Sequence, residues 1–114
     1  MDARKLPGAE KAVGPVEKLR DYCLDPEHPE GRHKARVFLY ALGLAQEDHA
    51  ILAECLVRAV IEEEAIEAGA TPYGVRYTVD FEMSYRGKTA KIRSGWMVRE
   101  GEGFPRLTSC YVDV

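Results

Sequence analysis

The chain has 114 residues, the usual size of one domain, and can bury a core without disulfide or metal cross-links. Its net charge of −3 is unusual for a nucleic-acid binder, but the charges are unevenly distributed. Residues 1–44 carry 8 basic and 7 acidic groups, residues 45–71 carry 1 and 7, and residues 72–114 carry 7 and 5. The acidity therefore belongs to one central segment.

Cysteine usage and hydropathy predict a cytoplasmic protein. Cys23, Cys55 and Cys110 are odd in number, far apart and set in apolar patterns, which is typical of buried thiols in a reducing compartment. No apolar run reaches the roughly 20 residues that span a bilayer, and no signal peptide is recognised. We therefore expect no membrane partner.

Three helices are predicted in the first part of the chain. Residues 5–9 contain proline and glycine and are expected to form an extended arm. A short helix begins at Pro15, and residues 25–31 form a rigid loop because two prolines and a glycine interrupt any helix there. A second helix spans 32–42 and ends at Gly43, and a third spans about 47–68 and ends at Gly69. Within the third, Glu62, Glu63, Glu64 and Glu67 are expected on a solvated face.

From residue 73 the hydrophobic period changes from about 3.6 to 2, which predicts strands. Apolar and aromatic residues alternate with polar ones over 73–81, the turn residues 85–87 follow, and a second alternating segment covers 90–98. A closing strand is expected over 106–111, with Tyr111 on the inward side and Cys110 on the outward side. Trp96 is expected in the core.

These elements predict an α+β fold in a single domain, residues 1–114. Helices in about residues 1–70 pack on one face of a small antiparallel sheet formed by about residues 71–114. The other face should be open, so functional side chains are sought there.

The open face is predicted to be basic and rich in hydroxyl groups. Strand alternation places there Arg76, Thr78, Asp80, Lys91, Arg93, Arg106 and Thr108. Arginine and hydroxyl groups together can bind phosphate. Cross-strand pairing of charges on a solvated sheet explains the same residues without a ligand.

His33 and Lys34 open the second helix, directly after the rigid loop. A histidine can exchange protons near neutral pH, and a neighbouring lysine can stabilise developing negative charge. Taken alone, His33 is better explained as a surface or loop-anchoring residue. No metal-ligand spacing, nucleotide-binding loop or nucleophile elbow is present in the sequence, so neither a metal nor a cofactor is expected.

Several stretches together resemble one family across nearly the whole chain. They are residues 5–9, 18–29, 31–38, 71–74 and 105–111, with Trp96. This pattern is similar to the domain of unknown function 6883 family. Val112 departs from it, because a proline is common after the motif tyrosine.

Members of that family resemble stand-alone small bacterial proteins and the C-terminal tips of bacterial toxins. The resemblance implies a toxin or toxin-derived module, with a small acidic antitoxin or immunity protein as its partner. The order of helices and sheet is also similar to that of the barnase, EndoU, colicin and RelE group of metal-independent ribonucleases, an analogy of fold alone.

The leading hypothesis is a toxin-like ribonuclease that cleaves an RNA phosphodiester without metal. His33 would act as general acid or base, Lys34, Arg93 and Arg106 would hold the phosphate, and Thr108 or Tyr111 would assist by hydrogen bonding. Arg76 and Lys91 would bind the substrate. This hypothesis requires His33 within about 10 Å of Arg93 and Arg106.

Two other functions fit the same residues. One is a non-catalytic module that docks a partner protein through its sheet face or acidic helix. The other is an RNA-binding protein without chemistry, which salt-sensitive binding without cleavage would reveal.

Overall fold

The helices of the N-terminal part form where apolar residues recur at helical spacing. A computed structural model of the chain describes residues 5–14 and 16–113. Its helical elements are η1 (Ala9–Lys11), α1 (Val16–Lys18), η2 (Leu19–Cys23), α2 (Arg32–Leu42), η3 (Gln46–Asp48) and α3 (His49–Glu62). The first predicted helix is present as α1 and η2, but its expected start at Pro15 lies outside the described residues. Residues 5–9 do not form a free arm, because Leu6 and Ala9 are buried in the core.

The second predicted helix is confirmed as α2. Ala35, Phe38 and Leu42 form its buried stripe. Gly43 ends it with φ +68°, a left-handed conformation that glycine adopts without a Cβ penalty. The helix therefore begins and ends where the sequence predicts.

The third predicted helix is wrong over its last turns. α3 ends at Glu62, and Ala65–Thr71 forms strand β1 instead of helix. Glu63 is already extended, with φ −90° and ψ 160°. Alanine-rich sequence favours a helix locally, but here pairing with the neighbouring strand prevails. The sheet thus begins before residue 70. Of the acidic run, Glu62 ends α3, Glu67 lies in β1, and Glu63 and Glu64 lie between the two elements.

Four antiparallel strands form the sheet in the order β1-β2-β3-β4. The other three strands are β2 (Gly74–Tyr85), β3 (Lys88–Arg99) and β4 (Pro105–Val112). Arg86 and Gly87 join β2 to β3 with φ values of +50° and +84°, as in a two-residue hairpin turn with left-handed residues. The predicted hairpin is confirmed.

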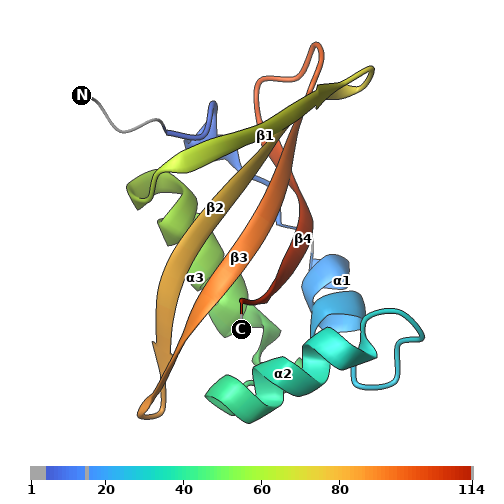
Figure 1. The fold of residues 1–114 in the computed structure, drawn as a ribbon, viewed down its shortest axis with the longest axis vertical. Helices are drawn as coiled ribbons and strands as arrows, with labels where there is room; N and C mark the ends of the chain where they lie inside the picture. The colour runs from blue at the N-terminus through green and yellow to red at the C-terminus, as the bar shows by residue number, and fades with distance from the viewer. Residues whose placement is uncertain (1–4, 15, 114) are drawn as a thin grey trace.

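The helices lie on one face of this sheet, which confirms the α+β prediction. α3 packs against β2, while α2 packs against β3 and β4. In Figure 1, α3 runs behind the strands, and α2 lies below them near the end of β4. Val79, Ile92 and Trp96 point into the core, with Trp96 only 1% exposed. Within the described chain, no helix crosses the opposite face, called the open face below.

A β-bulge changes which residues of β4 point inward. Trp96 pairs with Leu107, but the preceding residue of β3, Gly95, pairs with Ser109. Thr108 is therefore an extra residue in β4, and the alternation reverses after it. Leu107 and Cys110 are both buried as a result. The predicted inward position of Tyr111 and outward position of Cys110 are thus wrong: Cys110 enters the core and Tyr111 joins the open face.

Candidate functional site on the open sheet face

The open face is organised in rows of residues that lie side by side across β2, β3 and β4. One row is Asp80, Arg93 and Tyr111, the next is Thr78, Gly95 and Ser109, and a third is Arg76, Met97 and Arg106. Along β2 and β3 each row is displaced from the next by two residues, about 6 to 7 Å. In β4, the bulge at Thr108 separates the second and third rows by three residues. Apart from Cys110, the strand positions predicted to face outward therefore share this surface.

The first row forms a charged cluster at the C-terminal end of β4, called the Tyr111 cluster. Arg93 donates two hydrogen bonds, each 2.9 Å long, from Nε and Nη2 to the Asp80 carboxylate. The Asp113 carboxylate lies 3.6 Å from Arg93 and 3.7 Å from Lys91. The Arg93 hydrogen bonds are the main reason that the pKa of Asp80 is lowered. Asp80 thus stays ionised and holds the guanidinium in place.

Lys34 joins this cluster from α2. Its Nζ lies 5.0 Å from the centre of the Tyr111 ring, a cation–π contact. The pKa of Arg93 is raised, chiefly by its hydrogen bonds to Asp80, with a further contribution from the Tyr111 hydroxyl. The structure thus brings Lys34, Arg93 and Tyr111 together, three of the six residues predicted to be catalytic.

His33 directly precedes Lys34 in the first turn of α2, and its side chain is exposed. Its imidazole is therefore accessible to solvent. His28 has a structural role in the preceding loop, because its Nδ1 accepts hydrogen bonds from the backbone N–H groups of Glu30 and Gly31. This loop fixes the start of the helix that carries His33.

Arg106 lies in a different row from Arg93. Its Nε and Nη2 donate hydrogen bonds of 3.0 and 2.9 Å to Glu102, and its guanidinium lies 5.0 Å from the centre of the Phe104 ring. Its register partner Met97 is four residues from Arg93, about 13 Å along β3. The two arginines therefore share a face, but each is held by a different carboxylate and placed to contact a different phosphate of a strand.

Two adjoining hollows lie on the open face beside these rows. One, of about 350 Å³, is lined by Ala68, Arg76, Tyr77, Thr78, Gly95, Trp96, Met97, Thr108 and Ser109. The other, of about 600 Å³, is lined by Lys18, Tyr73, Met97, Arg99, Glu100, Arg106, Leu107 and Thr108. Met97 and Thr108 belong to both linings, so the two hollows are neighbours on this face.

Sequence reasoning missed several of these residues. Tyr73 was expected on the inward side of a strand, yet it precedes β2 and is 76% exposed. Ser109 was placed inward for the same reason as Tyr111. Lys18 comes from α1, and only the tertiary fold brings it to the sheet. No local pattern marks any of the three.

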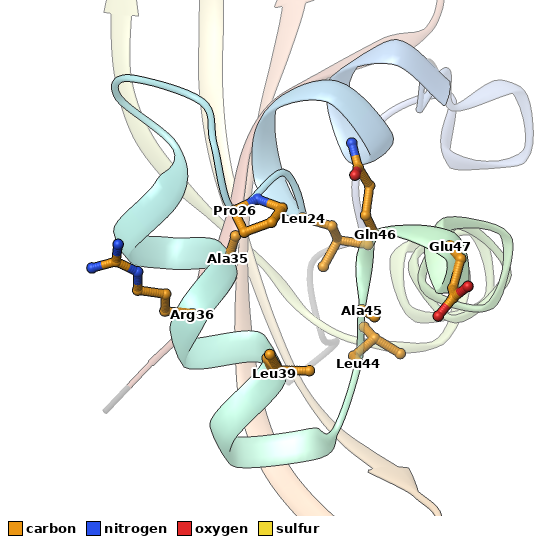
Figure 2. Close-up of a pocket in the computed structure, with 9 residues that line it drawn as sticks. All are labelled: Leu24, Pro26, Ala35, Arg36, Leu39, Leu44, Ala45, Gln46 and Glu47. Carbon is orange, nitrogen blue, oxygen red and sulfur yellow. The ribbon is translucent and has the colours of Figure 1, made fainter.

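A further cavity of about 330 Å³ lies on the helical side (Figure 2). Leu24, Leu39 and Leu44 give it a largely hydrocarbon lining, and Arg36 and Glu47 stand on opposite sides of it. None of the predicted catalytic residues lines this cavity. Arg93, Arg106 and Tyr111 lie on the open face instead.

The described residues contain no group of three His, Cys, Asp or Glu side chains placed to hold a metal ion. Within residues 5–14 and 16–113, no helix has the length and apolar character needed to cross a membrane.

Comparison with known proteins agrees with the fold and the family. No curated protein sequence matches the chain. Among solved structures, it is similar to one chain of a contact-dependent growth inhibition toxin–immunity protein complex from Klebsiella pneumoniae 342. The TM-score is 0.69 at 17% identity, over 89% of this chain and 99% of that one, which shows a shared fold. A family model described as "Domain of unknown function (DUF6883)" matches residues 5–114, and the chain therefore belongs to this family.

Proposed function

We propose that the protein is a toxin-like domain that cleaves an RNA phosphodiester without a metal ion. The observation that carries the proposal is the Tyr111 cluster, where Lys34 from α2 meets Arg93 and Tyr111 of the sheet. Cations and a phenol hydroxyl converge there on an open surface, which suits a phosphate in an RNA strand. The fold shared with a chain of a toxin–immunity protein complex supports the toxin-like part of the proposal.

His33 would transfer the proton in this reaction. It accepts the proton of the ribose 2′-hydroxyl, whose oxygen forms a bond to the adjacent phosphorus. The bond from phosphorus to the 5′ oxygen breaks, and that oxygen takes a proton from solvent. The products are a 2′,3′-cyclic phosphate and a 5′-hydroxyl, so neither a metal nor an oxidant is required.

Lys34, Arg93 and Tyr111 would stabilise the phosphorane-like charge that develops in this step. Lys34 and Arg93 contribute positive charge, and the Tyr111 hydroxyl donates a hydrogen bond. Asp80 and Asp113 position Arg93 and also partly neutralise its positive charge. Arg106 and Thr108 lie in neighbouring rows, so their role would be to hold adjacent parts of the RNA, with Arg76 and Lys91.

A second function is favoured by the charge pairing of the two arginines. Arg93 and Arg106 are each bound by two hydrogen bonds to a carboxylate of this chain, which reduces their availability to phosphate. β1 is also an edge strand that carries Glu67 and follows Glu63 and Glu64, all three exposed. A non-catalytic module that docks a partner through its sheet or this acidic edge accounts for both features. In a toxin, a small immunity protein would cover the same open face.

The test is expression in a bacterium together with cleavage of total RNA by the purified protein in the presence of a chelator. We expect growth arrest and RNA fragments ending in cyclic phosphate. His33→Ala should lower the cleavage rate by about 10²- to 10⁴-fold, the usual contribution of a general base. Lys34→Ala and the double change Arg93→Ala plus Arg106→Ala should also abolish growth arrest.

Arg58→Ala is the matched control, because Arg58 is an exposed cation on α3 whose side chain pairs only weakly with Glu54, at 3.7 Å. It should cleave like the parent. Normal growth with intact RNA, at confirmed folding and soluble expression, would overturn the ribonuclease proposal. Salt-sensitive RNA binding without cleavage would then indicate a binding protein, and its absence would favour the docking module.

A further inference from the structure

We propose that the bulge in β4 builds a second phosphate subsite, which binds the backbone of single-stranded RNA beside the Tyr111 cluster. Its residues are Arg76, Thr78, Thr108 and Ser109, called the bulge subsite here. The inference deepens the proposed function, since it assigns a binding site for the substrate of that reaction. The bulge subsite can be tested by measuring binding, independently of any cleavage.

The bulge places two consecutive hydroxyl groups on the same side of the sheet. In a regular strand, neighbouring side chains point to opposite faces. Here Thr108 and Ser109 both oppose Gly95, so their hydroxyl oxygens both approach the space above that glycine. Thr78 pairs with Gly95 from the other side and lines the same hollow. Hydroxyl groups from two strands therefore surround one position.

Gly95 keeps this position open. A Cβ built on Gly95 would lie 2.6 Å from the Ser109 Oγ and 3.0 Å from the Thr108 Oγ1, closer than normal contacts. Gly95 does not have a positive φ, so backbone conformation does not explain the glycine. The absence of a side chain is instead what leaves room for the hydroxyl groups and a ligand atom.

The two bulge hydroxyls are available to a ligand. Among the described residues, neither the Thr108 Oγ1 nor the Ser109 Oγ takes part in a hydrogen bond. By contrast, the buried hydroxyl of Ser94 on the inner face both donates and accepts. Outward hydroxyls of this kind can donate to phosphate oxygens.

Arg76 supplies the positive charge. It lies in the row beside Thr78, is exposed, and lines the same hollow as Thr108 and Ser109. Within the described part of the chain, its side chain forms no salt bridge, whereas Arg93 and Arg106 each have a carboxylate partner. Its guanidinium is therefore the more available phosphate ligand on this face.

The adjoining hollow gives the RNA strand a path away from the bulge subsite. Lys18, Arg99 and Arg106 line it with one carboxylate, Glu100. Tyr73, 76% exposed, lies at its border, where an unpaired base can stack on its ring. Cations combined with an exposed aromatic ring favour single-stranded nucleic acid over a duplex, whose bases are already stacked.

The test is the binding of a fluorescent single-stranded 2′-deoxy oligonucleotide, measured by anisotropy over a range of salt concentrations. This probe lacks the 2′-hydroxyl nucleophile, so it cannot be cleaved and reports binding alone. Arg76→Ala should weaken binding by about tenfold and reduce the slope of log K against log salt by about 0.7, as expected for one lost phosphate contact on a single strand. Gly95→Ala should weaken binding comparably by filling the subsite.

The double change Thr108→Val plus Ser109→Ala removes the two hydroxyl groups with little change in side-chain shape. It should also weaken binding, and it tests the subsite if Gly95→Ala does not fold. Gly103→Ala is the matched glycine control, because a Cβ there meets no atom within 4 Å, and Arg58→Ala is the matched charge control. Both should bind like the parent. Parent-like binding by folded Arg76→Ala and the double variant, or no binding by the parent at low salt, would overturn the inference. Subsite-dependent binding without any RNA cleavage would support it and would contradict the ribonuclease proposal.

Discussion

The Arg93 guanidinium donates two parallel hydrogen bonds to the Asp80 carboxylate across β2 and β3. This pair lies at the centre of the Tyr111 cluster and couples protonation of Asp80 to stability. Because hydrogen bonding to Arg93 lowers the pKa of Asp80 in the folded state, the ionised form stabilises the fold. That contribution is complete above the unfolded-state pKa, near 4, and is lost as the pH falls through the lower folded-state pKa.

Asp80→Asn should therefore be less stable than the parent at pH 7, and the difference should shrink as the pH falls below about 4. Urea unfolding of both proteins between pH 7 and pH 2 measures the difference directly. Hydrogen bonding to Arg106 lowers the pKa of Glu102 in the same way. This contribution to stability is the same in both proteins, so it cancels in the comparison. Glu82→Gln, an exposed carboxylate two residues along β2, is the control. A difference that grows toward low pH would contradict this account.

Ser94 connects the sheet to the core tryptophan. Its hydroxyl donates to the Val79 carbonyl at 2.7 Å and accepts from the Trp96 indole Nε1–H at 2.9 Å, and it is fully buried. Ser94→Ala leaves the indole N–H without a partner in the core. The free energy of unfolding should fall by about 1 to 3 kcal/mol.

Ser84→Ala is the control, because its hydroxyl bonds Thr89 at the surface. It should change the free energy of unfolding by no more than about 0.5 kcal/mol. Equal destabilisation by the two changes in denaturant titrations would show that burial of the Ser94 network does not matter.

The spacing of apolar residues predicted most of the fold, because most helices and strands bury one clear stripe of apolar side chains. α2 and the β2–β3 hairpin have such stripes, and turn residues mark their ends. β1 has almost none: Ala65 is buried, but Ile66 is 62% exposed and Glu67 to Ala70 are exposed. Its extended form comes from backbone pairing with β2, which local sequence does not encode. A helix was therefore the natural prediction for Ala65–Thr71.

The candidate site was predictable only in part for a similar reason. Arg76 and Arg93 follow simple alternation in β2 and β3, so their outward positions could be read from the sequence. Tyr111 and Ser109 could not, because a single inserted residue in β4 reverses the alternation beyond it. The contact between Lys34 and Tyr111 joins elements far apart in the chain. The sequence pattern therefore predicts which side of the sheet is polar, but not which of its residues lie side by side.

The weak side-chain burial of β1 predicts that it opens before the rest of the sheet. Its outer edge has no neighbouring strand in the sheet order, and its pairing with β2 shifts between Glu67 and Gly69. Amides of β1 that bond to β2 should exchange with solvent faster than those joining β2 and β3. Hydrogen exchange monitored by NMR measures both sets in one sample. Equal protection of the two sets would show that β1 unfolds only with the whole sheet.

The three thiols should differ sharply in reactivity because their burial differs. Burial raises the pKa of Cys23 to about 11 and that of Cys110 well above its ordinary value, while the pKa of half-buried Cys55 is raised less strongly. At pH 8, only about one Cys23 in a thousand is a thiolate, the reactive form.

Treatment of the native protein with a disulfide reagent should therefore modify Cys55 first, and raising the pH from 7 to 9 should accelerate that phase. Cys55→Ser should remove it, leaving two thiols that react only after unfolding. Rapid modification of native Cys55→Ser would show that the core around Cys23 and Cys110 opens readily.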